Sequence, residues 1–269
     1  MPYCENDGVR IYYEIEGNGP DLIMIHGFAA NMRVNWKLAG ITDALKGENR
    51  CIMMDCRGHG KSDKPTDPAM YGPKMVEDIV CLMEHLGIEK ANFLGYSMGS
   101  RLSLQLLMSQ PQRFKSVILG GFVLPHPARG SRAAPSAQRY RLVAKALLAD
   151  SLDEVTDPTG REFRRFAEST GSNLKALAAV MMARLDNQAD VLLSDPKALA
   201  ERLGSIPVPL MTIVGNDDFL PGDKSRMAML VPGGIHIQIQ GKDHLSVVPD
   251  PKFRMAVRAF LNYVNGRWG

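Results

Sequence analysis

Short apolar runs alternate with amphipathic helical patterns through the first 121 residues. Runs bounded by turn residues predict strands at Arg10–Glu16, Leu22–His26, Cys51–Asp55, Asn92–Tyr96 and Val117–Gly121. Apolar positions at helical spacing predict helices at about Trp36–Lys46, Pro73–Leu86 and Met98–Ser109. This alternation is typical of a mainly parallel sheet with helical crossovers. The first run lies between Asp7-Gly8 and Gly17-Asn18-Gly19-Pro20, which favours an antiparallel hairpin at the sheet edge.

The pattern changes at about residue 124, after which no convincing strand occurs for some eighty residues. Helical periodicity with intervening turn signals predicts helices at Ala137–Ala149, Arg161–Ser169, Leu174–Leu185 and Pro196–Leu203. The chain then returns to strands at Pro209–Val214 and Ile235–Gln240 and to a helix at about Pro251–Val264. We therefore predict a core domain formed by residues 1–123 and 205–269, with residues 124–204 inserted as a helical unit.

Composition narrows the class of protein. The chain has 269 residues, of which 45% are hydrophobic, so it can bury a sizeable core without disulfides. A net charge of +3 with interspersed acids and bases gives no basic stripe, which argues against a nucleic-acid partner. The N-terminus lacks a signal-peptide pattern and no apolar run is long enough to span a membrane, so we expect a soluble, cytoplasmic protein. The four cysteines lack metal-site spacing and are expected to be reduced structural thiols, although one disulfide is not excluded.

One pentapeptide carries the clearest chemical signal. Gly95-Tyr96-Ser97-Met98-Gly99 joins a predicted strand directly to a predicted helix. A serine projected from such a sharp turn takes a strained backbone conformation, and the flanking glycines relieve crowding. Ser97 is thus a candidate nucleophile, and we call the turn formed by Gly95–Gly99 the elbow.

A serine nucleophile needs a base and a third group that orients the base. The strand at Pro209–Val214 runs into Gly215-Asn216-Asp217-Asp218, and the strand at Ile235–Gln240 runs into Gly241-Lys242-Asp243-His244. These segments supply candidate acids and a base in the chain order Ser, Asp, His. His244 is preferred among the six histidines because it follows a strand end and precedes the final helix.

With these motifs the chain resembles the α/β-hydrolase superfamily over nearly all of its length outside the helical insert. The matching segments are His26-Gly27-Phe28, Asp55-Cys56-Arg57-Gly58-His59-Gly60-Lys61-Ser62, Gly95–Gly99, and the acid and base segments. The resemblance implies an eight-stranded, mostly parallel sheet flanked by helices, a helical cap over the active site, and no metal or cofactor. It also favours Asp218 over Asp217 as the acid, because relatives place the acid last in a G-x-x-D segment.

Other residues are expected to bind the oxyanion or to shape the loops around the site. A tetrahedral intermediate needs two N–H donors to its oxyanion. Met98, directly after the serine, supplies one, and the resemblance places the second at Phe28. The resemblance also implies that the Asp55–Ser62 segment shapes a loop, in which Asp55 and Arg57 form a local ion pair or bond to loop backbone. His26 and His59 are expected to orient backbone there.

Candidate substrate contacts come from the segments that follow two of the predicted strands and from the insert. We expect Phe28, Phe122, His126, Met181 and Met182 to line the pocket, with packing of the core or of the cap as the alternative. The insert lies where relatives carry a cap that excludes water and sets substrate shape.

The sequence therefore predicts a cofactor-free serine hydrolase that cleaves an ester, lactone or thioester of a small molecule through an acyl-enzyme. A serine at the elbow argues against relatives that use aspartate there, such as epoxide hydrolases and haloalkane dehalogenases. Carbon–carbon bond hydrolysis, peracid formation and a ligand sensor on a hydrolase scaffold remain alternatives, and the oligomeric state stays open.

Overall fold

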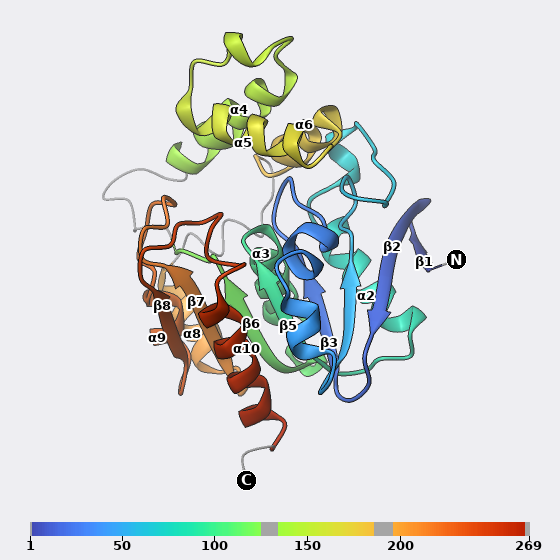
Figure 1. The fold of residues 1–269 in the computed structure, drawn as a ribbon, viewed down its shortest axis with the longest axis vertical. Helices are drawn as coiled ribbons and strands as arrows, with labels where there is room; N and C mark the ends of the chain where they lie inside the picture. Colours follow the sequence, from blue (N-terminus) through green and yellow to red (C-terminus); the bar gives the residue numbers. More distant parts are fainter. Residues whose placement is uncertain (1, 125–133, 186–195, 267–269) are drawn as a thin grey trace.

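The computed structural model describes residues 2–124, 134–185 and 196–266. Its centre is one eight-stranded sheet in the order β1-β2-β4-β3-β5-β6-β7-β8 (Figure 1). The strands are β1 (Tyr3–Asn6), β2 (Val9–Glu16), β3 (Asp21–Ile25), β4 (Arg50–Met54), β5 (Ala91–Tyr96), β6 (Phe114–Gly120), β7 (Leu210–Gly215) and β8 (Ile235–Ile239). All neighbours from β4 to β8 pair in parallel, which confirms the predicted mostly parallel sheet.

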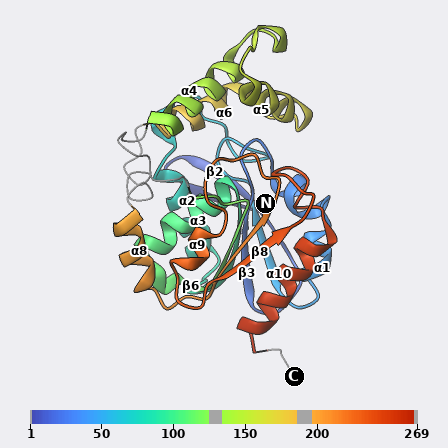
Figure 2. The same cartoon turned by 90° about the vertical axis from the view of Figure 1, so that its left-hand side faces the viewer.

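Helices cover both faces of the sheet, as Figure 2 shows. The helices of the body are α1 (Ile41–Leu45), α2 (Lys74–His85), α3 (Met98–Ser109), α8 (Pro196–Gly204), α9 (Arg226–Met229) and α10 (Pro251–Val264). Successive strand residues point to opposite faces, so each strand contributes to two cores. Ile23 and Phe93 pack with α2 and α3, whereas Leu22 and Leu94 pack with α1 and α10.

The antiparallel edge is larger than the sequence predicts. β2 pairs antiparallel with β4 and also with β1, a four-residue strand that the sequence pattern does not reveal. Asp7 and Gly8 both have positive φ, 52° and 69°, in the two-residue turn between β1 and β2. That conformation matches the twist of a tight hairpin.

The predicted helix at Trp36–Lys46 is wrong as a continuous element. The structure has a π-helical turn, η1 (Arg33–Lys37), followed by the short helix α1. Gly40 separates them with a left-handed φ of 70°, a conformation that interrupts an α-helix and suits glycine. Three short 3₁₀ turns, η2 (Pro68–Met70), η3 (Pro111–Arg113) and η4 (Leu152–Glu154), complete the described elements.

The inserted helices α4 (Ala134–Leu148), α5 (Pro158–Ser169) and α6 (Leu174–Ala183) lie together on one side of the body (Figure 1). The Thr170 hydroxyl at the end of α5 donates to the carbonyl of Ala29 at 2.8 Å, in the loop after β3. Helix α8, which the sequence assigns to the insert, packs on the body instead: the Arg202 guanidinium donates to the Met108 carbonyl at the end of α3 at 2.7 Å. We therefore propose that the cap ends before α8.

Cys4, Cys51 and Cys56 are buried and Cys81 is half-buried, and all four are free thiols. Burial raises the pKa of the Cys51 thiol to about 12, which keeps it protonated. Within the described ranges, no helix combines the length and the apolar character needed to cross a bilayer.

Candidate active site

Ser97 lies on a strained turn between β5 and α3. Its φ of 51° is unusual for a residue with a side chain, and its N–H donates to the Gly120 carbonyl of β6 at 2.7 Å. A Cβ on Gly95 would lie 2.5 Å from the Gly99 carbonyl oxygen, and a Cβ on Gly99 would overlap the Ile25 carbonyl. Only glycine fits at these two positions, as the spacing of the pentapeptide predicts.

A continuous chain of hydrogen bonds joins Ser97, His244 and Asp218. Ser97 Oγ lies 2.9 Å from His244 Nε2, and His244 Nδ1 lies 2.8 Å from Asp218 Oδ2. Both His244 and Asp218 are buried, and the second carboxylate oxygen of Asp218 accepts the Leu220 N–H at 2.9 Å. Asp217 is exposed, as its position in a loop permits. In such an arrangement the imidazole can take the hydroxyl proton while the carboxylate holds its orientation.

The loop that carries His244 is fixed by a compact turn. Asp243 Oδ1 accepts the N–H groups of Leu245 at 3.0 Å and Ser246 at 2.8 Å and the Ser246 hydroxyl at 2.7 Å. The Ser246 hydroxyl bond is the main cause that lowers the pKa of Asp243, so this carboxylate stays ionised. The Tyr96 hydroxyl donates to the His244 carbonyl from the far side of the elbow.

Phe28 and Met98, the two predicted oxyanion donors, line a cavity together with Ser97. No hydrogen bond to either N–H is present among the described residues. The Gly27 N–H, one residue earlier, donates to Asn35 Oδ1 at 2.7 Å, and Ala29, one residue later, has a φ of 59°. The backbone is therefore constrained on both sides of Phe28, the residue predicted to supply the second oxyanion donor.

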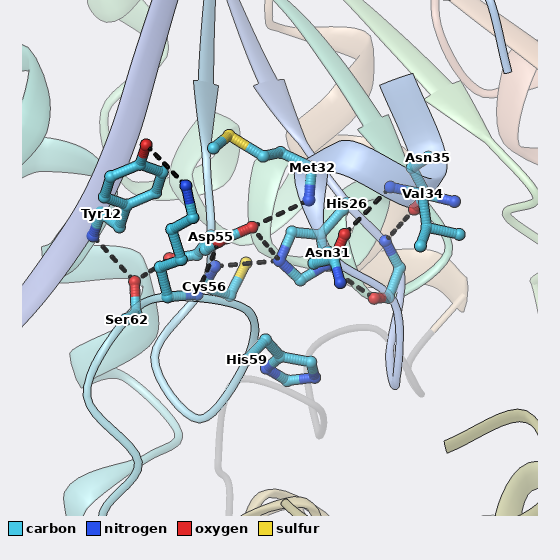
Figure 3. Close-up of polar contacts among 12 residues, drawn as sticks. Tyr12, His26, Asn31, Met32, Val34, Asn35, Asp55, Cys56, His59 and Ser62 are labelled. Carbon is cyan, nitrogen blue, oxygen red and sulfur yellow. Dashed lines mark hydrogen bonds and ion pairs between the residues drawn. The ribbon is translucent and has the colours of Figure 1, made fainter. Parts of the chain in front are cut away.

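His26 and Asp55 hold the surrounding loops together (Figure 3). The His26 Nδ1–H donates to the Gly27 carbonyl at 2.8 Å, and Nε2 accepts the Cys56 N–H at 3.0 Å. Burial lowers the pKa of His26 to about 4, so the ring is neutral at pH 7. Asp55 accepts the N–H groups of Met32 and Lys61, each at 2.8 Å. His26 and Asp55 therefore orient backbone, in agreement with the sequence-based expectation.

Arg57 does not pair with Asp55. Its guanidinium forms a buried bidentate ion pair with Asp78 of α2, with Nε 2.7 Å from Oδ2 and the second contact at 2.5 Å. A further N–H donates to the Met70 carbonyl at 2.6 Å. The ion pair connects the loop after β4 to α2. Asp78 is 21 residues away from Arg57 in the sequence, so local sequence patterns do not indicate this partner. His59 Nδ1–H donates to the Arg57 carbonyl at 3.0 Å.

Two cavities adjoin Ser97. The larger, of about 220 Å³, is mainly apolar and includes Asn35, Tyr96 and His244 among its lining side chains. The smaller, of about 80 Å³, is lined by residues of α3 and of the cap helices α4, α5 and α6. Phe28, Ser97 and Phe163 line both cavities, and the rings of Phe28 and Phe163 meet edge to face with centroids 5.8 Å apart.

Of the five predicted pocket residues, three lie at these cavities, one does not, and one is not described by the structure. Phe28, Phe122 and Met181 line the smaller one. Met182 is 43% exposed and lines neither, because consecutive helix residues point about 100° apart. His126 lies outside the described residues.

Sequence reasoning missed several lining residues. Asn35 and Phe163 carry no motif, and the smaller cavity also contains Arg101, Arg139 and Arg184. Of these residues, Arg101 could have been proposed from the sequence, because it lies one helical turn after Ser97. In residues 2–124, 134–185 and 196–266, no three His, Cys, Asp or Glu side chains are grouped as metal ligands.

Comparison with known proteins gives one family and several relatives. The family model described as alpha/beta hydrolase fold matches residues 20–189. A putative 2-succinyl-6-hydroxy-2,4-cyclohexadiene-1-carboxylate synthase of Bacillus subtilis is 26% identical over 225 residues, which cover 79% of this chain and 80% of that protein.

A second relative is a 2-hydroxy-6-oxononadienedioate/2-hydroxy-6-oxononatrienedioate hydrolase of Paraburkholderia xenovorans. It is 26% identical over 249 residues, covering 81% of this chain and 78% of that protein. The solved structure of a thermophilic esterase from Thermogutta terrifontis superposes with a TM-score of 0.75 at 20% identity, covering 98% of this chain and 97% of that chain.

Proposed function

Because the chain belongs to the α/β hydrolase fold family, we propose that it is a serine hydrolase that cleaves a carboxylic ester or a related acyl substrate such as a lactone or thioester. The observation that carries this proposal is the hydrogen-bonded chain from Ser97 Oγ through His244 to the buried Asp218 carboxylate. That chain begins on a strained turn that lines both cavities.

In the proposed reaction, Ser97 Oγ attacks the substrate carbonyl while His244 Nε2 takes its proton. The carbonyl oxygen becomes an oxyanion that accepts from the N–H groups of Met98 and Phe28. Met98 lies at the N-terminus of the twelve-residue helix α3, where the helix dipole also favours negative charge. Loss of one such donor typically costs about 10²–10³ in rate.

The intermediate then collapses and the carbon–oxygen or carbon–sulfur bond breaks. The protonated His244 gives its proton to the leaving group, and Ser97 keeps the acyl group. A water molecule, deprotonated by His244, attacks the acyl carbon of the acyl-enzyme. The bond from this carbon to Ser97 Oγ then breaks, Oγ takes the proton back from His244, and the acid product leaves. Throughout, Asp218 fixes the ring through Nδ1 and stabilises its positive charge.

The test is labelling by a fluorophosphonate probe combined with turnover of p-nitrophenyl butyrate. The wild type should label and turn over, whereas Ser97→Ala should lose the label and nearly all turnover. Asp217→Asn is the matched control for Asp218→Asn: the first should keep activity and the second should lose most of it. A Ser97→Ala variant with full turnover would overturn the proposal.

Carbon–carbon bond cleavage is the second candidate, and the dienedioate hydrolase of Paraburkholderia xenovorans is the relative that favours it. The segment Phe28-Ala29-Ala30-Asn31 argues against it, since carbon–carbon hydrolases often carry a serine-glycine-proline-like segment there. Loss of absorbance of a 2-hydroxy-6-oxodienoate, compared with ester turnover by the same preparation, distinguishes the two reactions. The names of both sequence relatives include a carboxylate group in the compound they describe.

A further inference from the structure

The two cavities beside Ser97 differ sharply in charge. The larger cavity has His244 as its only titratable side chain besides Tyr96 among the described lining residues. The smaller cavity has three arginines, Arg101, Arg139 and Arg184, among its lining residues. A substrate that occupies both cavities therefore meets mainly apolar residues in the larger one and three arginines in the smaller one.

The three arginines come from separate elements. Arg101 lies on the first turn of α3, Arg139 on α4, and Arg184 at the end of α6. The cap thus completes the cluster only when it lies over the body. Tyr140 is the common neighbour of the two cap arginines, since its ring centroid lies 4.8 Å from Cζ of Arg184 and 5.9 Å from Cζ of Arg139. This packing holds both guanidiniums at the cavity.

The rest of this cavity is mainly apolar. Apart from the three arginines, Tyr140 and Ser97, its described lining residues are apolar or glycine, and they include Phe122, Val143 and Met181. Low-polarity walls strengthen the attraction between a guanidinium and an anion. Each guanidinium has five N–H donors, so one that also bonds within the protein keeps donors for a ligand.

We propose that Arg101, Arg139 and Arg184 form a carboxylate-binding subsite, and that the substrate carries a carboxylate a few atoms from the bond cleaved. The planar fork of arginine matches the two oxygens of a carboxylate. A volume of about 80 Å³ suits a carboxylate with a short methylene link. The inference rests on the proposed hydrolase function, because it assumes that the substrate reacts at Ser97.

Matched ester pairs test the subsite. The mono-p-nitrophenyl ester of adipic acid differs from p-nitrophenyl hexanoate by a carboxylate in place of the terminal methyl group. The pair 4-acetoxybenzoate and phenyl acetate places the carboxylate in the leaving group instead. For one of the two pairs, kcat/KM of the wild type should favour the anionic member, and added salt should reduce that preference.

Variants assign the preference to the arginines. Arg139→Gln and Arg184→Gln should each lower kcat/KM for the preferred anionic ester about tenfold or more and change the neutral ester by less than about threefold. Arg184→Lys should lose less, because it keeps the charge. Arg141→Gln, on an exposed position of α4, is the control and should behave like the wild type. Equal effects on anionic and neutral esters would overturn the proposal.

A binding measurement separates this inference from the proposed reaction. Calorimetry of monomethyl adipate with Ser97→Ala should give a dissociation constant that rises about tenfold when Arg184→Gln is added, and methyl hexanoate should show no such rise. If the wild type hydrolyses no ester but this difference persists, the reaction fails and the subsite stands. If both ligands bind alike, the subsite fails whatever the turnover.

Discussion

Acid should destabilise this protein through two histidines that no solvent reaches. His26 and His59 are fully buried, with ring centroids 5.1 Å apart, in the loops beside Ser97. Burial lowers the pKa of His26 from 6.5 to about 4, and burial with the neighbouring His26 lowers that of His59 to about 3. Both rings are therefore neutral in the fold over a pH range in which the unfolded chain protonates them.

The sign and size follow from this difference in proton binding. Between pH 6.5 and the folded pKa, the unfolded state binds one more proton per histidine, so stability is complete above pH 6.5 and falls as the pH drops. From pH 7.5 to 4.5, each histidine removes about 2.5 kcal/mol and the two remove about 5 kcal/mol. Since whole domains have stabilities of about 5–15 kcal/mol, this loss brings the fold close to acid unfolding.

The assay is urea unfolding followed by circular dichroism at half-unit steps from pH 7.5 to 4.5. Near pH 5, His26 and His59 together should contribute about 2.5 kcal/mol per pH unit to the fall in the free energy of unfolding, and His59→Asn should remove about half of that contribution. Asn keeps a donor for the Arg57 carbonyl but does not titrate. The slope is the readout, because the smaller side chain also lowers stability at every pH.

His85→Asn is the matched control, since it removes an imidazole from the exposed end of α2. Its slope should equal that of the wild type. If the slope of His59→Asn also equals that of the wild type, then His59 is protonated in the fold and the reasoning from burial is refuted.

Two further predictions concern the packing of the loops and the cap. Asp78→Leu leaves the buried Arg57 guanidinium without its countercharge and should lower the free energy of unfolding, measured in urea, by about 3–5 kcal/mol. Adding Arg57→Met should restore most of the loss. An Asp78→Leu variant with the stability of the wild type would contradict this. Thr170→Val removes the hydrogen bond from the Thr170 hydroxyl of the cap to the Ala29 carbonyl in the loop after β3. KM for p-nitrophenyl butyrate should therefore rise about two- to tenfold with little change in kcat. An unchanged KM would show that this bond does not hold the cap.

The fold could be read from local patterns to a large extent. Strand and helix periodicity with the turn residues predicted seven of the eight strands and the order of elements, because these signals depend on neighbours in the sequence. The missed strand β1 has only four residues, and the misjudged helix at Trp36–Lys46 is interrupted at Gly40. Short elements whose conformation depends on packing carry too little local signal.

Ser97, Asp218 and His244 could be proposed from the sequence because each follows a strand of one parallel sheet. The carboxyl ends of parallel strands meet at one edge, so the order of strands brings these distant residues within hydrogen-bond distance. Their catalytic roles remain a proposal that labelling and turnover will test.

The sequence by itself determined the order of most helices and strands along the chain, the glycines on both sides of Ser97 and the residues that follow each strand, since these depend on backbone geometry and local spacing. Only the tertiary structure decided that Arg57 pairs with Asp78, that α8 packs on the body, and that Arg139 and Arg184 of the cap line the same cavity as Arg101. Ion pairs and cavities form between side chains from distant segments, and their partners are set by how the layers pack rather than by any local pattern.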